Sequence, residues 1–294
     1  MTPKEVSRAI KCDRDQHPRL RKVVETHAAR VFLNTMVSKL TLSMPRAHFG
    51  PVPIPTYQPT TSRCSPWLTP LAYFLGRYLV LPFYFRHISV LGQENLPHSG
   101  PVILAPTHRA RWDSIILPLA AGRVETGRDL RYMVTSDEVK GIQGWFIRRL
   151  GGFPVNVRSP SISSLRHGID LLQQGEMLVI FPEGGIFRDR VVHRLKPGLA
   201  RLAVQAEALP PALGVKVVPV SIHYTSPYPR WRDRVTVKIG TPLEVSHYLQ
   251  AGTNSDRLKT SAKQLTEDLS TALKALSGEA IPSSPETVDS GDEG

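Results

Sequence analysis

A histidine and an aspartate are the two residues of this sequence whose types and spacing most directly suggest chemistry. His108 and Asp113 lie in PVILAPTHRARWDSIILP, where an apolar run ends and a helical pattern begins. A carboxylate that contacts an imidazole holds one tautomer and leaves the other ring nitrogen free to accept a proton. The pair therefore predicts a general base at the end of a strand. The alternative is a surface histidine followed by an acidic residue in the first turn of a helix, and the pair alone does not decide between them.

The segment FPEGGIFRD, residues 181–189, is the second candidate for chemistry, and it follows the apolar run MLVI. Gly184 and Gly185 allow backbone amides to approach a ligand closely. Glu183, with Arg188 and further basic residues after it, predicts a polar pocket rim that has positive charge for a phosphate group. The spacing of a P-loop is absent. The alternative is a solvated turn that leads into a charged segment.

A third candidate is the segment GWFIRRLGGFPVNVR, residues 144–158. Arg158 ends a short predicted strand, so its side chain is expected near the same sheet edge as His108 and Glu183. A solvated charge at the end of a strand is an equally good interpretation of Arg158. The other two arginines of the segment end a predicted helix, where they would counter the helix dipole.

These residues need a scaffold, and the hydrophobic pattern predicts an α/β fold. Short β-branched runs alternate with helical periods, which is typical of a sheet covered by helices. Apolar residues at spacings of three and four predict helices over 162–172 and 258–276. We expect a mixed, mostly parallel central sheet of about seven strands, and the candidate strands are His87–Leu91, Val102–Ala105, Leu130–Thr135, Phe153–Val157, Met177–Phe181, Lys216–Tyr224 and Val235–Ile239. Pro219, within the sixth of them, predicts a bulge or a strand end near the site, or an edge strand.

The aromatic segment WLTPLAYFLGRYLVLPFYF, residues 67–85, raises the question of a membrane. As a helix it would reach about 28 Å. Arg77 near its middle and two prolines argue against a span, whereas the many aromatic residues favour a helix or hairpin in one leaflet. A buried core helix is the alternative. The chain is accordingly divided into a basic leader and proline-rich linker (1–66), a membrane-associating helical segment (67–86), an α/β domain (87–276) and an acidic disordered tail (277–294).

Composition restricts the classes of partner. The chain of 294 residues has 37 Lys and Arg against 25 Asp and Glu, a net charge of +12, which favours phosphate-rich partners. Nucleic acid is disfavoured, because no recognition-helix, zinc-finger or aromatic RNA-binding signature accompanies the charge. Cys12 and Cys64 have no spacing typical of a metal site or a disulfide framework, and the N-terminus does not resemble a secretory signal. We therefore expect no metal, a reducing compartment and the cytoplasmic face of a membrane.

Four ordered blocks give the sequence a resemblance to a known family. It resembles the glycerolipid acyltransferases typified by lysophosphatidic acid acyltransferase, and the matching blocks are His108 to Asp113, Gly144 to Arg158, Phe181 to Gly184 and Val217 to Ile222. The resemblance implies that His108 is the general base, that Asp113 orients it, and that Arg158 and Glu183 bind the acceptor. It implies transfer of a fatty acyl group from acyl-CoA or acyl-acyl carrier protein, a co-substrate rather than a bound cofactor, to lysophosphatidic acid.

One departure from the family pattern concerns the acceptor. Many relatives continue Phe-Pro-Glu-Gly with Thr-Arg-Ser, whereas this chain has Gly185, Ile186 and Phe187, and Arg188 is the nearest cation. We expect Arg188 to supply the phosphate contact and amides near Gly184 and Gly185 to stabilise the oxyanion. No cysteine lies in a plausible site and no G-x-S-x-G motif occurs, so we expect direct attack without an acyl-enzyme. The alternatives are a related enzyme that uses glycerol 3-phosphate or another lysophospholipid, and a non-catalytic basic module that binds membrane surfaces.

Overall fold

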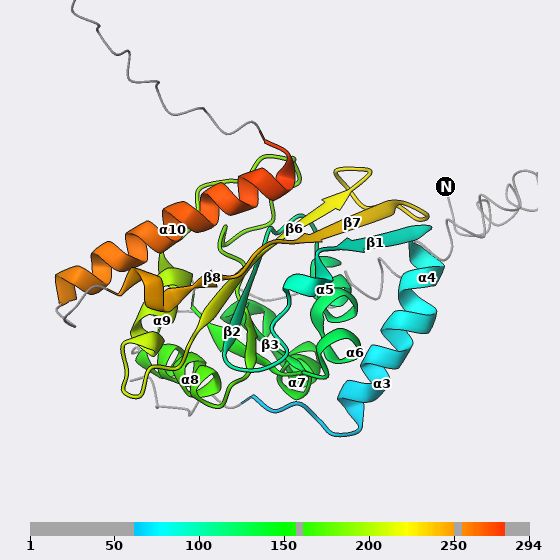
Figure 1. Cartoon of the computed structure of the whole chain (residues 1–294). Coiled ribbons are helices and arrows are strands. Elements are labelled where there is room, and N and C mark those ends of the chain that lie inside the picture. Colours follow the sequence, from blue (N-terminus) through cyan, green and yellow to red (C-terminus); the bar gives the residue numbers. More distant parts are fainter. Residues whose placement is uncertain (1–61, 157–160, 250–254, 280–294) are drawn as a thin grey trace, which may run out of the picture. The chain divides into compact units, whose positions relative to one another are not determined.

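The fold is an α/β sandwich built on one eight-stranded sheet (Figure 1). The computed structural model describes residues 62–156, 161–249 and 255–279. The strands are β1 (His87–Leu91), β2 (Val102–Pro106), β3 (Leu130–Thr135), β4 (Gly152–Val155), β5 (Met177–Val179), β6 (Lys216–Tyr224), β7 (Arg234–Ile239) and β8 (Leu243–Glu244). Their order is β1-β7-β6-β2-β5-β3-β4, and β8 pairs with β6. The predicted mixed, mostly parallel sheet is confirmed.

The direction of the strands decides where a site can form. Strands β6, β2, β5, β3 and β4 are parallel to one another. Strands β7 and β8 are antiparallel to β6, and β1 is parallel to β7. The carboxyl ends of β2, β5 and β6 therefore meet at one edge in the centre of the sheet. Ligands of open α/β sheets bind outside this edge.

Helices cover both faces of the sheet, because alternate residues of each strand point to opposite faces. In β2, Ile103 and Ala105 belong to the core cluster shared with α8, α9 and α10, whereas Val102 and Leu104 belong to the cluster shared with α5. The helices are α3 (Leu68–Leu75), α4 (Leu81–Tyr84), α5 (Asp113–Ala121), α6 (Arg123–Thr126), α7 (Gly141–Arg149), α8 (Ile162–Gln173), α9 (Gly198–Glu207) and α10 (Ser255–Ser277). The two helices predicted from hydrophobic spacing are α8 and α10.

Five strands differ from the prediction, and two of them, β2 and β7, differ by one residue. Strand β5 ends at Val179 rather than Phe181, because the chain turns at Pro182, where Gly184 donates its N–H to the carbonyl of Phe181. Strand β8 was not predicted, since two residues carry no periodicity. The last residue of the predicted strand over 153–157 lies outside the described residues.

Pro219 interrupts pairing without marking an edge strand. One side of β6 pairs with β2. The other side pairs with β8 up to Val217 and with β7 from Val220 onwards. Pro219, which has no N–H to donate, lies in the gap between these two partners, and its carbonyl accepts the N–H of Gly240. The predicted bulge or strand end is wrong, because β6 continues through Pro219 in unbroken register with β2. The edge-strand alternative is also wrong, because β6 has partners on both sides.

The predicted membrane-associating segment is helical along most of its length. Helix α3 continues through a π-helical turn (Gly76–Val80) into α4, which ends at Tyr84. Most of its large apolar side chains are exposed, whereas Leu68 and Leu81 are buried. Within the described ranges, we find no helix with the length and hydropathy that crossing a bilayer requires. The leader up to residue 61 and the tail from residue 280 lie outside the described residues, so the predicted domain boundaries stay predictions.

Candidate active site

The site begins where β2 ends. Thr107 fixes this end of the strand to β6, because its N–H donates to the carbonyl of Val220 and its Oγ1 accepts the N–H of Ile222. The loop that follows contains His108 and leads into α5, whose first residue is Asp113. The strand end and the helix start therefore lie close enough together for the two side chains to meet.

His108 and Asp113 are in direct contact, with 2.9 Å between Nδ1 and Oδ2. The Asp113 side chain is fully buried, and its Oδ2 also accepts the N–H groups of Arg109 and Ala110, at 2.7 and 2.9 Å. A carboxylate surrounded by donors acts as an acceptor, so Nδ1 carries the proton and Nε2 has a free lone pair. The His108 side chain is 19% exposed, and its Nε2 makes no hydrogen bond within the described parts of the chain.

Asp113 therefore fulfils both interpretations of the sequence. It orients the imidazole, and it also accepts the amide hydrogens of the loop that starts α5, which satisfies donors that have no partner within the helix. The imidazole is held from its face as well, because the ring of Phe181 stacks on it at 4.0 Å between centroids. Few other orientations remain open to His108.

Tyr224, at the end of β6, completes the surroundings of the buried carboxylate. Its hydroxyl donates to Oδ1 of Asp113 at 2.6 Å. Burial and the neighbouring Asp113 charge raise the pKa of Tyr224 far above its usual value, so the phenol keeps its proton and remains a donor. Sequence analysis did not single out this tyrosine, since 111 positions separate it from Asp113.

We predict that Tyr224→Phe lowers the free energy of unfolding by roughly 1 to 3 kcal/mol, because Oδ1 of a buried carboxylate then lacks its donor. Denaturant unfolding of the purified protein measures the change. The matched control is Tyr248→Phe, since the Tyr248 hydroxyl donates to Asp268 at 2.8 Å on the exposed surface. An equal loss in both variants would show that burial of the Asp113 contact has no special weight.

Glu183 points into the protein rather than towards solvent. Its side chain is buried, with Oε2 accepting the N–H of His108 at 2.9 Å and Oε1 accepting the N–H of His193 at 3.0 Å. Nη1 of Arg109 contacts both carboxylate oxygens, at 2.9 and 3.1 Å. The residue predicted to bind the acceptor thus positions the backbone of the predicted base.

Arg109 is a residue of this site that sequence analysis missed. Its side chain is buried, and its guanidinium also donates to the carbonyls of Phe187 and Val191, at 3.3 and 3.1 Å. Phe187 in turn donates its N–H to the carbonyl of His108 at 2.8 Å. The His108 loop and the loop after β5 are therefore fastened to each other. The only signal in the sequence was an arginine inside the His-x4-Asp block, and arginines in loops are usually exposed.

Gly184, Gly185 and Arg188, three of the remaining predicted residues, lie near the surface at this edge. Gly184 has a positive φ of 69°, and a Cβ there would lie 2.6 Å from Nζ of Lys196, so the glycine lets this lysine cross the turn. Arg188 is exposed, with its guanidinium carbon 4.6 Å from the ring centre of Tyr228. Gly185 lies between them, half-buried. Arg158 lies outside the described residues.

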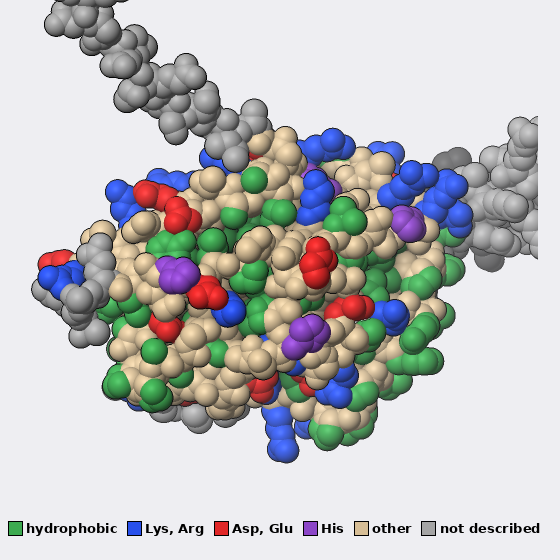
Figure 2. All heavy atoms as spheres, in the orientation of Figure 1, with side chains coloured by type: hydrophobic (Ala, Val, Ile, Leu, Met, Phe, Trp, Pro, Cys, Tyr) green, Lys and Arg blue, Asp and Glu red, His purple; other side chains and the backbone are tan. Residues whose placement is uncertain are grey.

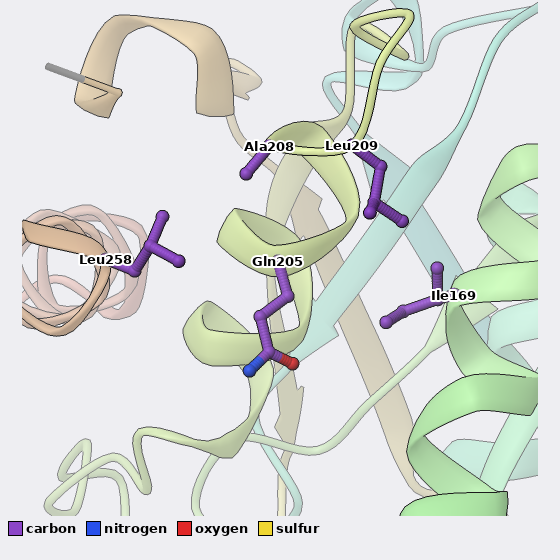
Figure 3. A pocket seen from close by; sticks show the side chains of 5 residues that line it. All are labelled: Ile169, Gln205, Ala208, Leu209 and Leu258. Carbon is purple, nitrogen blue, oxygen red and sulfur yellow. The ribbon is translucent and has the colours of Figure 1, made fainter. Parts of the chain in front are cut away.

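One hollow lies apart from this cluster (Figure 3). It has a volume of about 440 Å³ and is lined by Ile169 of α8, by Gln205, Ala208 and Leu209 of α9 and the turn after it, and by Leu258 of α10. These residues lie on the helices that cover the face opposite to α5. None of these five side chains is ionisable. Within the described residues, no group of histidine, cysteine and acidic side chains is arranged to hold a metal ion.

Comparisons with known proteins find similarity over the part of the chain that contains these residues. The family model described as Acyltransferase matches residues 87–223, which include the His108–Asp113 pair and the turn at Glu183. The matched segment is therefore similar to the acyltransferase family. The predicted resemblance to glycerolipid acyltransferases is confirmed by the relatives that the chain matches.

Two bacterial relatives carry the name 1-acyl-sn-glycerol-3-phosphate acyltransferase. The protein of Streptococcus pneumoniae is 27% identical over 177 residues, which cover 56% of this chain and 61% of the relative. That of Bacillus subtilis is 32% identical over 123 residues, covering 41% of this chain and 58% of the relative. This chain thus spans about three fifths of the length of either relative.

A solved structure shows the same fold. The crystal structure of the 1-acyl-sn-glycerophosphate (LPA) acyltransferase PlsC from Thermotoga maritima has a TM-score of 0.52 and 21% sequence identity. The match covers 73% of this chain and 81% of that one. The sheet and helices of this chain therefore have the fold of that structure.

Proposed function

We propose that this protein transfers a fatty acyl group from a thioester carrier to the free hydroxyl of lysophosphatidic acid, giving phosphatidic acid. The observation that carries the proposal is the contact between His108 and Asp113, which leaves Nε2 free at the sheet edge. The relatives of Streptococcus pneumoniae and Bacillus subtilis support this acceptor by their names.

His108 acts as a general base and then as a general acid. Nε2 removes the proton of the acceptor hydroxyl while the hydroxyl oxygen attacks the carbonyl carbon of the thioester. The carbon–sulfur bond then breaks, and the proton passes from Nε2 to the departing sulfur. Asp113 stabilises the positive charge that the imidazole carries between these steps. Such proton transfer contributes about 10²- to 10⁴-fold to the rate.

The oxyanion that forms in this step needs a donor. The amide of Gly184 already donates to the carbonyl of Phe181. The amide of Gly185 has no such backbone bond within the described residues, so we assign the oxyanion contact to Gly185. Positive charge for the acceptor phosphate comes from Arg188 and Lys196 at the same turn, together with Arg158, whereas Glu183 holds the His108 loop.

The reaction proceeds without an acyl-enzyme. The backbone of Cys64 forms an isolated β-bridge with Leu150. Leu150 lies before the amino end of β4, whereas His108 follows the carboxyl end of β2, so the two residues lie at opposite edges of the sheet. Burial raises the pKa of the Cys64 thiol to about 11, so it stays protonated at neutral pH and is a poor nucleophile. Direct attack by the acceptor hydroxyl requires only the imidazole and the thioester, with acyl-CoA or acyl-acyl carrier protein as the donor.

Glycerol 3-phosphate is the second candidate acceptor, because residues 185–187 read Gly-Ile-Phe where many relatives have Thr-Arg-Ser. The test is release of thiol from acyl-CoA and from acyl-acyl carrier protein with lysophosphatidate, glycerol 3-phosphate or lysophosphatidylcholine. We expect release with lysophosphatidate to exceed that with the other acceptors, with phosphatidate as the product by mass spectrometry. Preference for glycerol 3-phosphate would transfer the proposal to that acceptor. No turnover with any acceptor would support a non-catalytic binding module.

The lipid acceptor implies a membrane, and we propose that the segment over 67–86 holds the protein at its cytoplasmic face. The support is an exposed row of aromatic and aliphatic side chains along α3 and α4, which suits the interface between headgroups and acyl chains.

A further inference from the structure

We infer that the loop between β6 and β7, residues 225–233, forms together with α4 a docking surface for an anionic lipid bilayer. The inference deepens the proposed function, on which it rests for the origin of the acceptor lipid. It assigns a membrane contact to a part of the chain that lies more than a hundred positions from the aromatic segment, and it assigns the contact a charge requirement.

The loop is fastened to the end of α4. Nε1 of Trp231 donates to the carbonyl of Phe83 at 2.8 Å, and the N–H of Arg232 donates to the carbonyl of Tyr84 at 2.6 Å. The Tyr84 hydroxyl donates to the carbonyl of Pro229 at 3.0 Å. The loop thus satisfies two of the carbonyls that a helix end leaves without partners. Helix and loop therefore present one continuous surface.

This surface has aromatic residues at the positions that face solvent. The side chains of Phe83 and Trp231 are 68% and 49% exposed, and their ring centres lie 6.2 Å apart. Tyr228 of the same loop is also exposed. Exposed tryptophan and tyrosine next to an apolar helix are typical of residues that lie at the level of lipid headgroups.

The same surface has unpaired positive charge. Arg86, Arg230, Arg232 and Arg234 are exposed, and in the described part of the chain none of these four guanidinium groups lies in an ion pair. The one acidic residue of the loop, Asp233, turns inward to accept the N–H of Arg230 and the hydroxyl of Ser226. Figure 2 shows basic side chains gathered near the junction of α4 and β1, beside the apolar ones along α3 and α4.

The positive charge and the aromatic residues together favour an anionic lipid bilayer as the binding partner of this surface. Basic groups close to an anionic bilayer each contribute to binding, and the aromatic rings and the apolar face of α3 and α4 enter the interface. An acidic protein would use the charges but leave that long apolar row uncovered. The surface also adjoins the site: Tyr228 contacts Arg188, and Tyr84 stacks on Trp112, directly before Asp113, at 4.2 Å between ring centres.

Vesicle binding by the full chain tests the inference, without any substrate. The variant Arg230→Gln/Arg232→Gln/Arg234→Gln keeps the backbone contacts of the loop and removes three charges. The matched control is Arg166→Gln/Lys259→Gln/Lys263→Gln, which removes three exposed charges from α8 and α10. Sedimentation with phosphatidylcholine vesicles that contain phosphatidylglycerol gives the partition coefficients, at low and high salt. Circular dichroism confirms that both variants are folded.

We expect the loop variant to bind these vesicles about 100-fold more weakly at low salt, since each basic residue near the surface contributes roughly fivefold. The control should lose much less, and high salt should bring wild type and loop variant together. Equal losses in the two variants, unchanged binding of the loop variant, or equal wild-type binding to pure phosphatidylcholine would overturn the inference. The inference would also be overturned if the loop variant bound acyl carrier protein more weakly than wild type but bound vesicles equally well. Wild type that binds vesicles but transfers no acyl group would refute only the proposed function.

Discussion

Replacing His108 with alanine is expected to lower kcat for acyl transfer by about 10²- to 10⁴-fold, because the variant lacks the nitrogen that is proposed to accept the hydroxyl proton. Nε2 of His108 is the free nitrogen of an imidazole whose Nδ1 is fixed by a buried carboxylate. The KM for lysophosphatidate should change less than kcat, since proton transfer occurs only in the transition state. Thiol release under saturating acyl-CoA and lysophosphatidate measures both constants.

The matched control for this variant is His247→Ala. His247 also lies beside a carboxylate, with 3.5 Å between its Nε2 and Oε2 of Glu244, but it is exposed on the turn after β8. Its replacement should leave kcat within about twofold and the unfolding curve nearly unchanged, as for other exposed ion pairs. If His108→Ala kept near wild-type turnover while remaining folded, the general-base assignment would be wrong.

Glu183→Gln is expected to produce the largest loss of stability among single substitutions at this site. The glutamate is the only carboxylate in contact with the buried guanidinium of Arg109 within the described residues. Removal of one charge from a buried pair leaves the other uncompensated and costs about 3 to 5 kcal/mol. For a domain of this size the melting temperature should fall by about 6 to 20 °C. Calorimetry, or circular dichroism during heating, measures the shift.

The control for Glu183→Gln is Glu244→Gln. Glu244 pairs with Lys216 at 3.3 Å, and both side chains are about half exposed, so this pair should contribute no more than about 1 kcal/mol. Glu183→Gln should also lower kcat in the fraction that stays folded, since Oε2 of Glu183 accepts the N–H of His108. A melting temperature within about 2 °C of wild type, the shift expected for loss of an exposed ion pair, would contradict the assigned role of Glu183.

The scaffold of the site was predictable from local patterns. Short runs that contain β-branched residues marked β1, β3 and β6 at their observed bounds, because such side chains pack well against neighbours in a sheet. The position of His108 after β2 followed from the end of an apolar run, and Asp113 followed from the start of a helical pattern. Contact between the two was expected because the loop between them is short.

Contacts between distant segments were not predictable in this way. Arg109 and Glu183 are 74 positions apart, and nothing in the spacing of either indicates that they are buried together. A charged residue next to a glycine-rich turn is exposed by default, which is why Glu183 was expected to face a ligand. The fastening of the β6–β7 loop to α4 is likewise a long-range result, since it pairs a helix end with side chains 148 positions further along.

A single oxygen atom of Asp113 accepts hydrogen bonds from the His108 imidazole and from two amides of the loop that leads into α5. The same carboxylate therefore fixes both the backbone of this loop and the orientation of the ring. A change that loosens the loop would also free the imidazole, so the position of the ring depends on a short piece of backbone next to the strand end.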